Sequence, residues 1–373
     1  TALQKALKVD DSVEEMYRFV ALAGDANPPL DKIALYCEES PAHFDWLVAQ
    51  GIPYSEKLTL AKGLPMGDES LYFSGTEQAW PARELAKPAL RGHVPGVDGM
   101  NGGRRLMEAL VSRAYTLGVS LRASVSADRL VYAPKLYECS VPWGNVDDQG
   151  DGINMGIAVG AAALRMHEGF AIAPIYPPEN VLSGIVVNAS GQRFISEESY
   201  HGVLGDAITY HQKGQAWLIT DQRSGYNFHQ DNFLPVAEGS SIDVIAAQLG
   251  FPLGALQQTV NYYNQHATNG DDPMFRKSKT YLRPLQGAPY KAWDLSVADA
   301  FFPAHTFGGL HTNLDGQVLS SFGDIIPGLY AAGRNTAGIP TAPYIASGLS
   351  VGDCTFFGRR AGRAVAALDG GLS

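Results

Sequence analysis

Two stretches near the start of the chain carry apolar side chains at helical spacing. They span residues 13–22 and 30–50, and the apolar positions of the second are Ile33, Leu35, Tyr36, Phe44, Leu47 and Val48. Because residues three or four apart share one face of a helix, this pattern predicts amphipathic helices that begin near Ser12 and Asp31. Pro41 has no backbone N–H, so we expect it to divide the second stretch into two helices.

The remaining pattern predicts a mixture of helices and strands. Helices are predicted over 102–117, 152–166, 242–249 and 253–265, and strands over 119–131, 183–187, 190–194, 216–220 and 326–332. Residues 51–100 are rich in glycine and proline and hold little periodicity, which is typical of a functional loop. Because the elements follow no repeating unit, the pattern favours a discontinuous α/β domain with an α+β insert.

The C-terminal segment carries the most informative pattern. The predicted strand 326–332 ends at Gly333, and Ser347 is a candidate N-cap for a helix that contains Gly348, Gly352, Gly358 and Gly362. Since each glycine in a helix costs about 1 kcal/mol relative to alanine, we expect something to lie close to this helix's backbone. A helix N-terminus offers unpaired N–H groups and partial positive charge. It therefore suits an electron-rich heterocycle that becomes negative when reduced, such as a flavin.

Composition narrows the class of protein. The 373 residues carry a net charge of −10, from 38 acidic and 28 basic side chains, which argues against nucleic acid as a partner. Cys37, Cys139 and Cys354 have no metal-ligand or redox spacing, so we expect no metal site and a reducing compartment. No apolar run approaches the roughly 18 residues of a membrane helix, and the first ten residues do not form a signal peptide. A cytoplasmic protein without integral membrane association is expected.

Several short motifs follow one another in an order typical of one flavoprotein superfamily. They are TALQKA (1–6), YFSG (72–75), RGHVP (91–95), GDG (150–152), NASGQRF (188–194), FGGL (307–310) and the glycine-rich stretch 327–362. Over nearly its whole length the chain resembles the fumarate-reductase-like flavoproteins, and within them the 3-ketosteroid Δ4-dehydrogenases. The resemblance implies FAD as cofactor, with a discontinuous Rossmann-like FAD-binding domain in residues 1–173 and 308–373. It also implies an inserted α+β cap, the substrate and catalytic domain, in residues 174–307.

Relative to this superfamily the FAD-binding domain is expected to be incomplete. Its members open with a strand and a G-x-G-x-x-G motif that binds pyrophosphate at a helix N-terminus, and residues 99–103 lack the spacing for that motif. Members also carry a strand-rich stretch where this chain runs directly from Tyr132 to Ala133. We therefore expect the sequence to be part of a longer polypeptide, with an intact mass above 40.0 kDa.

The resemblance also implies catalytic residues. Tyr200 matches the tyrosine that projects from the cap domain, the alternative being a structural tyrosine bonded to backbone. Tyr344 and Ser347 match a tyrosine and a serine in the loop that enters the glycine-rich helix, one residue further apart than the Tyr-x-Ser of the Δ4 group. Which tyrosine is the base, and which polarises the ketone, is left open.

For the cofactor, the resemblance implies two backbone segments and one loop. Gly333, Arg334 and Asn335 are expected to line the flavin ring and ribityl chain, the alternative being an ordinary turn. The N–H groups at the start of the helix, contributed by Ser347, Gly348, Leu349, Ser350 and Val351, are expected at the N1–C2=O edge of the flavin. Thr1 and Ala2 match a loop that passes close to the flavin.

The substrate is expected to be a neutral ketone. His305 and Thr306 resemble the pair that binds a substrate carboxylate in fumarate reductases. Those enzymes also need arginines in two further segments, and the segments that match them here, 199–205 and 340–348, contain no Arg or Lys. A buried dicarboxylate without cations would be poorly stabilised, so His305 is interpreted as a cavity-wall residue. A flat apolar wall for a fused-ring substrate is predicted from Tyr72, Phe73, Trp80, Tyr176, Phe301 and Phe302.

The function predicted from the sequence is FAD-dependent α,β-dehydrogenation of a 3-ketosteroid or similar bulky ketone. In such a reaction hydride goes to the flavin, a tyrosine takes the proton, and an external electron acceptor reoxidises the cofactor. Two alternatives stay open: a flavin-dependent ene-reductase of the same superfamily, and a flavin-free binding protein or degenerate relative.

Overall fold

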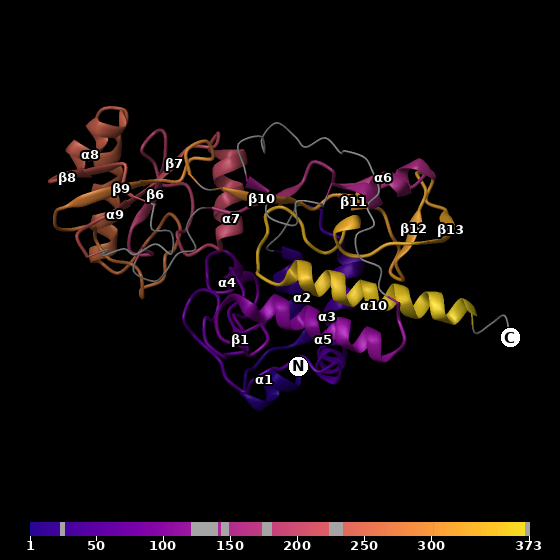
Figure 1. Cartoon of the computed structure of the whole chain (residues 1–373). Coiled ribbons are helices and arrows are strands. Elements are labelled where there is room, and N and C mark those ends of the chain that lie inside the picture. The colour runs from indigo at the N-terminus through magenta and orange to yellow at the C-terminus, as the bar shows by residue number, and fades with distance from the viewer. Residues whose placement is uncertain are drawn as a thin grey trace.

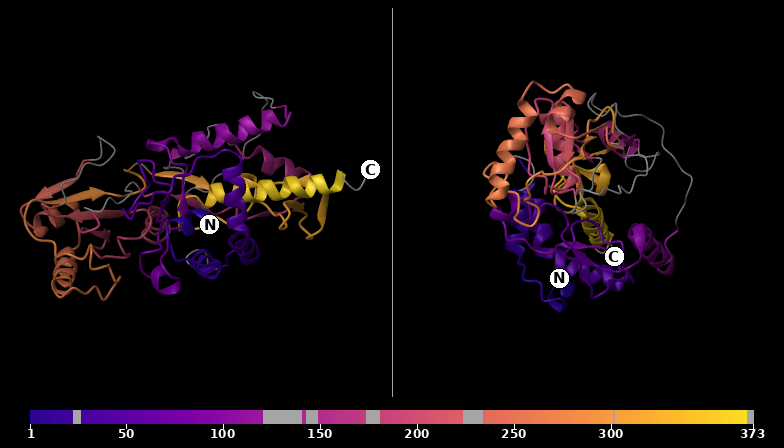
Figure 2. Two further views of the ribbon diagram at one scale, coloured as in Figure 1. Left: turned by 90° about the horizontal axis from the view of Figure 1, so that it is seen from below. Right: turned by 90° about the vertical axis from the view of Figure 1, so that its left-hand side faces the viewer.

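A computed structural model of the chain describes residues 1–22, 27–120, 141–142, 149–173, 181–223, 234–300 and 302–369. The molecule is elongated, with a four-stranded sheet and its helices at one end and the C-terminal helix running toward the other (Figures 1 and 2). Most of the predicted strand 119–131, as well as Cys139, Tyr176 and Phe301, lies outside the described residues.

The N-terminal part is a group of helices joined by long loops. Its elements are α1 (Ala2–Ala6), α2 (Val13–Leu22), α3 (Leu30–Ala49), β1 (Leu71–Tyr72), α4 (Ala82–Leu85), β2 (Gly92–His93), η1 (Gly99–Asn101) and α5 (Gly102–Thr116). The prediction that Pro41 divides the second helix is wrong, since α3 continues through it. Proline leaves the Cys37 carbonyl without its usual N–H donor, and the hydroxyl of Ser40 donates to that oxygen instead (3.2 Å).

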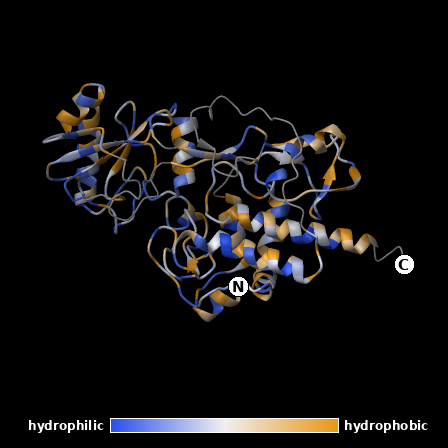
Figure 3. Cartoon of the chain, in the orientation of Figure 1, coloured by the Kyte–Doolittle hydropathy of each residue, from blue (hydrophilic) through white to orange (hydrophobic). Residues whose placement is uncertain are grey.

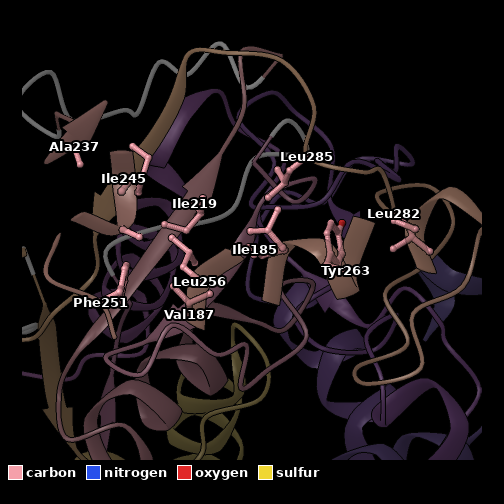
Figure 4. Close-up of a cluster of buried hydrophobic side chains, with 14 residues drawn as sticks. Ile185, Val187, Ile219, Ala237, Ile245, Phe251, Leu256, Tyr263, Leu282 and Leu285 are labelled. Atoms are coloured by element: carbon pink, nitrogen blue, oxygen red, sulfur yellow. The ribbon is translucent and has the colours of Figure 1, made fainter. Parts of the chain in front are cut away.

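The four-stranded antiparallel sheet has the order β6-β7-β9-β8 and is formed by Ile185–Asn188, Ala216–Thr220, Tyr290–Asp294 and Ala237–Gly239. Alternate residues of β6 face opposite sides of the sheet. Ile185 and Val187 pack against α8 (Ile242–Leu249) and α9 (Ala255–Thr268), as Figure 4 shows. Val186 packs on the other side. The predictions for 216–220 and for both helices are confirmed. The predicted strand 190–194 is wrong, because it holds only one isolated bridge, between Val187 and Arg193.

The opposite face of this sheet packs on α7 (His201–Asp206), which runs into a π-helical turn, η3 (Ala207–His211). Between the sheet and the far end of the molecule lie three small sheets. They are β3-β10-β5 (Val141–Pro142, Pro303–Thr306, Gly169–Ala171), β11-β4 (Gly309–Leu310, Ala163–Leu164) and β12-β13 (Gln317–Leu319, Ile325–Tyr330). The predicted helix 152–166 is α6 (Asp151–Ala158) and ends early. Gly160 adopts φ +91°, which turns the chain into β4.

Helix α10 (Leu349–Asp369) is the longest helix among the described residues and follows a short turn, η4 (Gly333–Asn335). Its apolar residues pack on α2 and α3 through a core that includes Phe19, Ile33, Phe356 and Phe357. Its first turn therefore lies beside the N-terminal helices. Figure 3 shows how hydrophobic and hydrophilic residues alternate along α10. None of the helices in the described ranges is long and apolar enough to cross a bilayer.

Candidate active site

A cavity of about 370 Å³ lies between the N-terminal helices and the first turn of α10. Its size falls within the range of roughly 300–1,000 Å³ that ligand pockets occupy. Five of the predicted site residues line it: Thr1, Ser347, Gly348, Leu349 and Val351. The lining described for this cavity does not include the other predicted residues, namely Ala2, Tyr200, Gly333, Arg334, Asn335, Tyr344 and Ser350.

The start of α10 is built around Gly348. Its carbonyl accepts the first helical hydrogen bond, from the N–H of Gly352 (2.8 Å), and its φ of +89° lies in the left-handed region. Gly348 thus occupies the N-cap position, and the prediction of Ser347 as N-cap is wrong by one residue. The Ser347 N–H instead donates to the Ser74 carbonyl (2.7 Å), and its hydroxyl shares a hydrogen bond with Tyr72.

The first turn of α10 leaves donors for a ligand. The N–H of Ser350 donates to the Tyr344 hydroxyl oxygen (2.9 Å), whereas the N–H groups of Leu349 and Val351 find no acceptor within the described part of the chain. Leu349 and Val351 both line the cavity. Unpaired N–H groups at a helix N-terminus favour electron-rich oxygen or nitrogen acceptors. The cavity therefore fits the heterocycle predicted from the sequence.

A buried carboxylate supports the loop that flanks this helix end. Glu77 accepts hydrogen bonds from the N–H and hydroxyl of Ser74 and from the N–H of Gly75 (2.6 Å). Gly75 in turn bridges Ala346, and a Cβ at this glycine would overlap the Ile345 carbonyl oxygen. Burial raises the pKa of Glu77, and its hydrogen bonds oppose that shift. The chain from 72 to 77 is thus locked beside 345–347.

His93 also lines the cavity and connects the motifs RGHVP and TALQKA. Its Nδ1 lies 2.9 Å from the Arg91 carbonyl, and its Nε2 lies 2.9 Å from the hydroxyl oxygen of Thr1. Since a carbonyl can only accept, Nδ1 carries the proton and Nε2 accepts from Thr1. Burial lowers the pKa of His93 to about 4, so the ring is neutral at pH 7.

Tyr200 and Tyr344 meet in an aromatic cluster, which also contains Phe170 and Phe307. The two tyrosine rings lie 6.1 Å apart between centroids, and each residue is only 5% exposed. Tyr200 comes from the residue before α7, and Tyr344 comes from the loop before α10. The structure therefore brings together the two tyrosines that the sequence analysis singled out.

The hydroxyl of Tyr344 connects the aromatic cluster to the helix end at the cavity. Its oxygen accepts from the N–H (2.9 Å) and from the hydroxyl (3.1 Å) of Ser350. Burial raises the pKa of Tyr344 to about 12, although the bonds from Ser350 lower it, so the phenol is protonated at pH 7. With its oxygen occupied as acceptor, its own proton is available for donation.

His305 lies at the edge of the same cluster, with its ring edge-on to Phe170 at 5.1 Å. Burial, reinforced by the charge of Arg334, lowers the pKa of His305 to about 4. His201 packs on Tyr200 at 4.1 Å, and burial lowers the pKa of His201 to about 3. Both rings are neutral at pH 7.

The predicted segment Gly333–Asn335 lies behind the helix end. Gly333 has φ +64° and packs on Cys354 of α10, and the Asn335 side chain fills the place where a side chain at Gly152 would begin. This segment therefore joins the start of α6 to α10. Its role toward a cofactor stays a prediction.

The predicted aromatic wall is only partly assembled. Tyr72 lines the cavity, and the Trp80 ring lies under the Arg276 guanidinium (6.0 Å). Phe302 is 1% exposed in the core beneath the four-stranded sheet, so it is not a wall residue. Sequence reasoning missed Glu77 and His93 as site residues, although the motifs YFSG and RGHVP mark their neighbourhoods.

Comparisons with known proteins agree with this geometry. A model of the FAD binding domain family (FAD_binding_2) matches residues 144–348. The crystal structure of 3-ketosteroid-Δ4-(5α)-dehydrogenase from Rhodococcus jostii in complex with 4-androstene-3,17-dione is 34% identical. It covers 97% of this chain and 85% of its own, with a TM-score of 0.88. These matches confirm the resemblance deduced from the motifs.

The curated relatives include enzymes that act on different substrates. Urocanate reductase from Eggerthella lenta is 27% identical over 98% of this chain and 66% of its own length. The 3-oxo-5-alpha-steroid 4-dehydrogenase from Comamonas testosteroni is 30% identical over 57% of this chain and 44% of its own length. The present chain thus spans between about two fifths and two thirds of these relatives.

Proposed function

Since this chain belongs to the FAD binding domain family and its cofactor is FAD, we propose that it catalyses α,β-dehydrogenation of a 3-ketosteroid or a similarly bulky ketone. The observation that carries the proposal is the buried pair Tyr200 and Tyr344, with the Tyr344 hydroxyl on the first turn of α10. Its support among solved structures is the similarity to the steroid-bound dehydrogenase, at 34% identity. Family membership also sets aside the flavin-free alternative.

The cofactor is assigned to the cavity at the start of α10. The N–H groups of Leu349 and Val351 would hold the electron-rich edge of the flavin, beside Ser347, Gly348 and Ser350. Thr1, Ala2 and the segment 333–335 are proposed as further contacts. When bound, FAD supplies the acceptor for a hydride from the carbon β to the ketone.

The domain division remains part of the proposal. Residues 1–173 and 308–373 would form a Rossmann-like FAD-binding domain, completed by polypeptide beyond this sequence, and residues 174–307 the cap. Its support is that all four strands of the β6-β7-β9-β8 sheet fall between residues 174 and 307. Tyr200 would then approach the site from the cap, and Tyr344 from the FAD-binding domain.

The two tyrosines are given different roles by their surroundings. Tyr344 is protonated, and its oxygen already accepts two hydrogen bonds from Ser350, so we assign it to donate to the ketone oxygen. Polarising the ketone makes the neighbouring C–H more acidic, and Tyr200 is assigned to take that proton. Ser347, bonded to Tyr72 at the cavity, is a further hydroxyl for positioning the ketone.

A neutral substrate is supported by the charges around this pair. Segments 199–205 and 340–348 contain no Arg or Lys. Arg165, which reaches this region, donates to the backbone carbonyls of Gly338 and Pro340 (3.2 Å to Pro340). Arg334 acts on His305 beside this pair, but one cation does not supply the two partners that a buried dicarboxylate requires.

Replacing Tyr200 by phenylalanine tests the proposal. We expect Tyr200→Phe to lower turnover of a saturated 3-ketosteroid, measured with an artificial electron acceptor, by about 10²–10⁴-fold, the usual contribution of a general base. FAD content, measured by visible absorbance, is expected to stay unchanged. The control is Tyr290→Phe, which also deletes a tyrosine hydroxyl but in β9 of the four-stranded sheet. It is expected to retain turnover within about twofold. Near-normal turnover of Tyr200→Phe would remove Tyr200 from the mechanism.

An ene-reductase acting on an unsaturated acid is the second candidate. Its support is the match to urocanate reductase over 98% of this chain and the charge of Arg334, which acts on His305 and could pair with a carboxylate. Anaerobic assays decide between the two. Reduction of unsaturated acids by the dithionite-reduced enzyme, without oxidation of any steroid in a panel, would favour the reductase.

A further inference from the structure

The segment that carries Tyr200 is fixed from inside the cap by a buried ion network. Glu197 accepts from Arg193 (Nη2 to Oε2, 2.8 Å) and lies 3.0 Å from the Lys277 ammonium. Arg193 also binds Asp272 (2.9 Å). All four charged side chains are at most 3% exposed. The backbone three residues before Tyr200 is therefore tied to both ends of the loop 272–278.

The next residue, Glu198, is held from two directions. One carboxylate oxygen accepts from the N–H of Ser278 (2.6 Å) and lies 3.9 Å from the Arg83 guanidinium. The carbonyl of Glu198 accepts from the ammonium of Lys62. Lys62 and Arg83 belong to the N-terminal part, whereas Ser278 belongs to the loop 272–278. Glu198 thus joins the Tyr200 segment to both.

Arg276 completes the connection on the outer side. Its guanidinium binds Glu84 of α4 (2.6 Å) and covers the Trp80 ring (6.0 Å), and its carbonyl accepts from Arg83. Its own N–H donates to the Asp272 carbonyl (2.9 Å). A φ of +48° places Arg276 in the left-handed region, which costs a non-glycine residue about 1 kcal/mol or more and persists only where surrounding contacts impose it.

We propose that residues 272–278, here called the connector loop, position Tyr200 by coupling its segment to α4. The inner end of the loop binds Glu197 and Glu198, and Arg276 at its outer side binds Glu84 and, through its carbonyl, Arg83. Arg276 and Glu84 are positioning residues, since neither touches the aromatic cluster. The inference rests on the proposed role of Tyr200.

Positioning matters here because the two tyrosines come from opposite sides of the site. Tyr200 belongs to the cap side and Tyr344 to the loop before α10, so their separation of 6.1 Å depends on how the two sides are held together. Misplacing a reacting group by about 1 Å costs roughly 10²-fold in rate. A loop that ties α4 to the Tyr200 segment therefore controls catalysis without contacting substrate.

A charge swap tests the connector loop without disturbing the core. The side chains of Arg276 and Glu84 are 57% and 47% exposed, so replacing them does not empty a buried site. We expect Arg276→Glu and Glu84→Arg each to lower kcat about fivefold with little change in KM, since an exposed ion pair contributes up to about 1 kcal/mol. The double variant restores an opposite-charge pair and is expected to return kcat to within about twofold of the starting protein.

The pair Lys57 and Asp68 is a matched control. It has the same nitrogen–oxygen distance, 2.6 Å, and similar exposure, 60% and 47%, but both residues lie in the N-terminal part. Swapping it is expected to leave kcat unchanged. Loss of kcat in this control equal to that in the Arg276 and Glu84 variants would overturn the proposal, and so would a double swap that fails to recover.

Hydrogen exchange separates this inference from the proposed function. Peptides covering 197–204 are expected to exchange faster in either single variant and at the original rate in the double variant, in FAD-loaded protein. If Tyr200→Phe retains turnover while this exchange pattern holds, the coupling stands and the role of Tyr200 falls. If Tyr200→Phe is inactive and exchange is unaffected by the swaps, the coupling is overturned and the proposed function stands.

Discussion

The four-stranded sheet region and the cavity region bury polar groups in different ways. In the sheet region, Arg193, Glu197, Asp272 and Lys277 form one ion network whose members pair with one another. Burial alone would raise the pKa of Glu197, but Arg193 and Lys277 hold it below its usual range. This network leaves no strong donor or acceptor over for a ligand, so it is suited to holding a segment in place.

Around the cavity, the polar groups include neutral rings, hydroxyls and backbone N–H groups, beside one buried ion pair between Arg91 and Asp11 (2.6 Å). His93 is held neutral by burial, Ser347 pairs with Tyr72, and the N–H groups of Leu349 and Val351 have no acceptor within the residues described. Neutral donors next to an open space cost less to desolvate than free charges would. The difference teaches that the sheet region uses charge for rigidity, whereas the cavity region leaves backbone dipoles unsatisfied at the site proposed for the cofactor.

Breaking the ion network is expected to have the largest effect. Arg193→Met leaves Glu197 and Asp272 facing each other without their shared cation, which costs about 3–5 kcal/mol of unfolding free energy. Urea unfolding followed by circular dichroism measures it. Arg18→Met, which breaks exposed pairs with Glu14 and Glu15, is the control and is expected to change stability by less than about 0.5 kcal/mol. A loss below about 1 kcal/mol for Arg193→Met would contradict the structural role of the network.

His93, in the cavity region, is expected to make the stability of the folded chain depend on pH. The pKa of His93 is lowered to about 4 in the folded chain, from 6.5 in the unfolded chain, so the unfolded state binds the proton first as pH falls. The folded state therefore loses stability from pH 6.5 toward pH 4, by roughly 3 kcal/mol at most from this ring. Asp353 opposes this trend, because burial raises its pKa from 3.8 to about 6 and favours the folded state as pH falls.

The variant His93→Gln isolates the contribution of this one ring. Between pH 4 and pH 6.5 its unfolding free energy is expected to depend on pH less steeply than that of the starting protein, by up to about 1.4 kcal/mol per pH unit. Denaturant unfolding at half-unit steps of pH measures the difference. Parallel pH profiles for the two proteins would show that His93 is not held neutral in the folded state.

Much of the fold follows from local patterns that can be recognised in the sequence. Apolar periodicity located α2, α8, α9 and the strand 216–220, because their packing faces coincide with their intrinsic periods. The error at Pro41 arose because the sequence rule counts only the lost N–H, whereas the Ser40 hydroxyl replaces that donor in the folded helix. The early end of α6 was hidden by a run of small residues that fit both a helix and a turn at Gly160.

The candidate site was only partly predictable for a physical reason. The glycine-rich start of α10 and the two tyrosines stand in recognisable motifs, so their neighbourhood could be deduced. His93 acts through a contact with Thr1, which is distant along the chain. Glu77 bonds to nearby Ser74 and Gly75, but it matters to the site because Gly75 bridges the distant Ala346. Nothing in one sequence reports such pairings. The same holds for the connector loop, whose contacts with α4 join residues nearly 200 positions apart.

A smaller effect is expected from the carboxylate that supports the cavity loop. Glu77→Gln replaces an acceptor of three hydrogen bonds by an amide that can accept with only one atom, at a cost of about 1–3 kcal/mol. The loop 72–77 would then release Ser347, so FAD affinity, measured by fluorescence titration of the deflavinated protein, is expected to fall about tenfold. Glu69, which is only partly buried, provides the control variant Glu69→Gln. Unchanged affinity in Glu77→Gln would separate this loop from the cofactor site.

The smallest effects come from a glycine just before α10, Gly348, and a glycine within it, Gly362, and they are expected to have opposite signs. At Gly348 the backbone is left-handed and a Cβ would meet nothing within 4 Å, so Gly348→Ala loses about 1 kcal/mol through backbone strain alone. At Gly362 the backbone is helical and the space is also open, so Gly362→Ala gains up to about 1 kcal/mol. Thermal unfolding measures both, and FAD titration is expected to weaken only for Gly348→Ala, which borders the cavity. If both substitutions stabilised the protein equally, the left-handed turn before α10 would not exist in solution, and the N–H groups assigned to the flavin would lose their orientation.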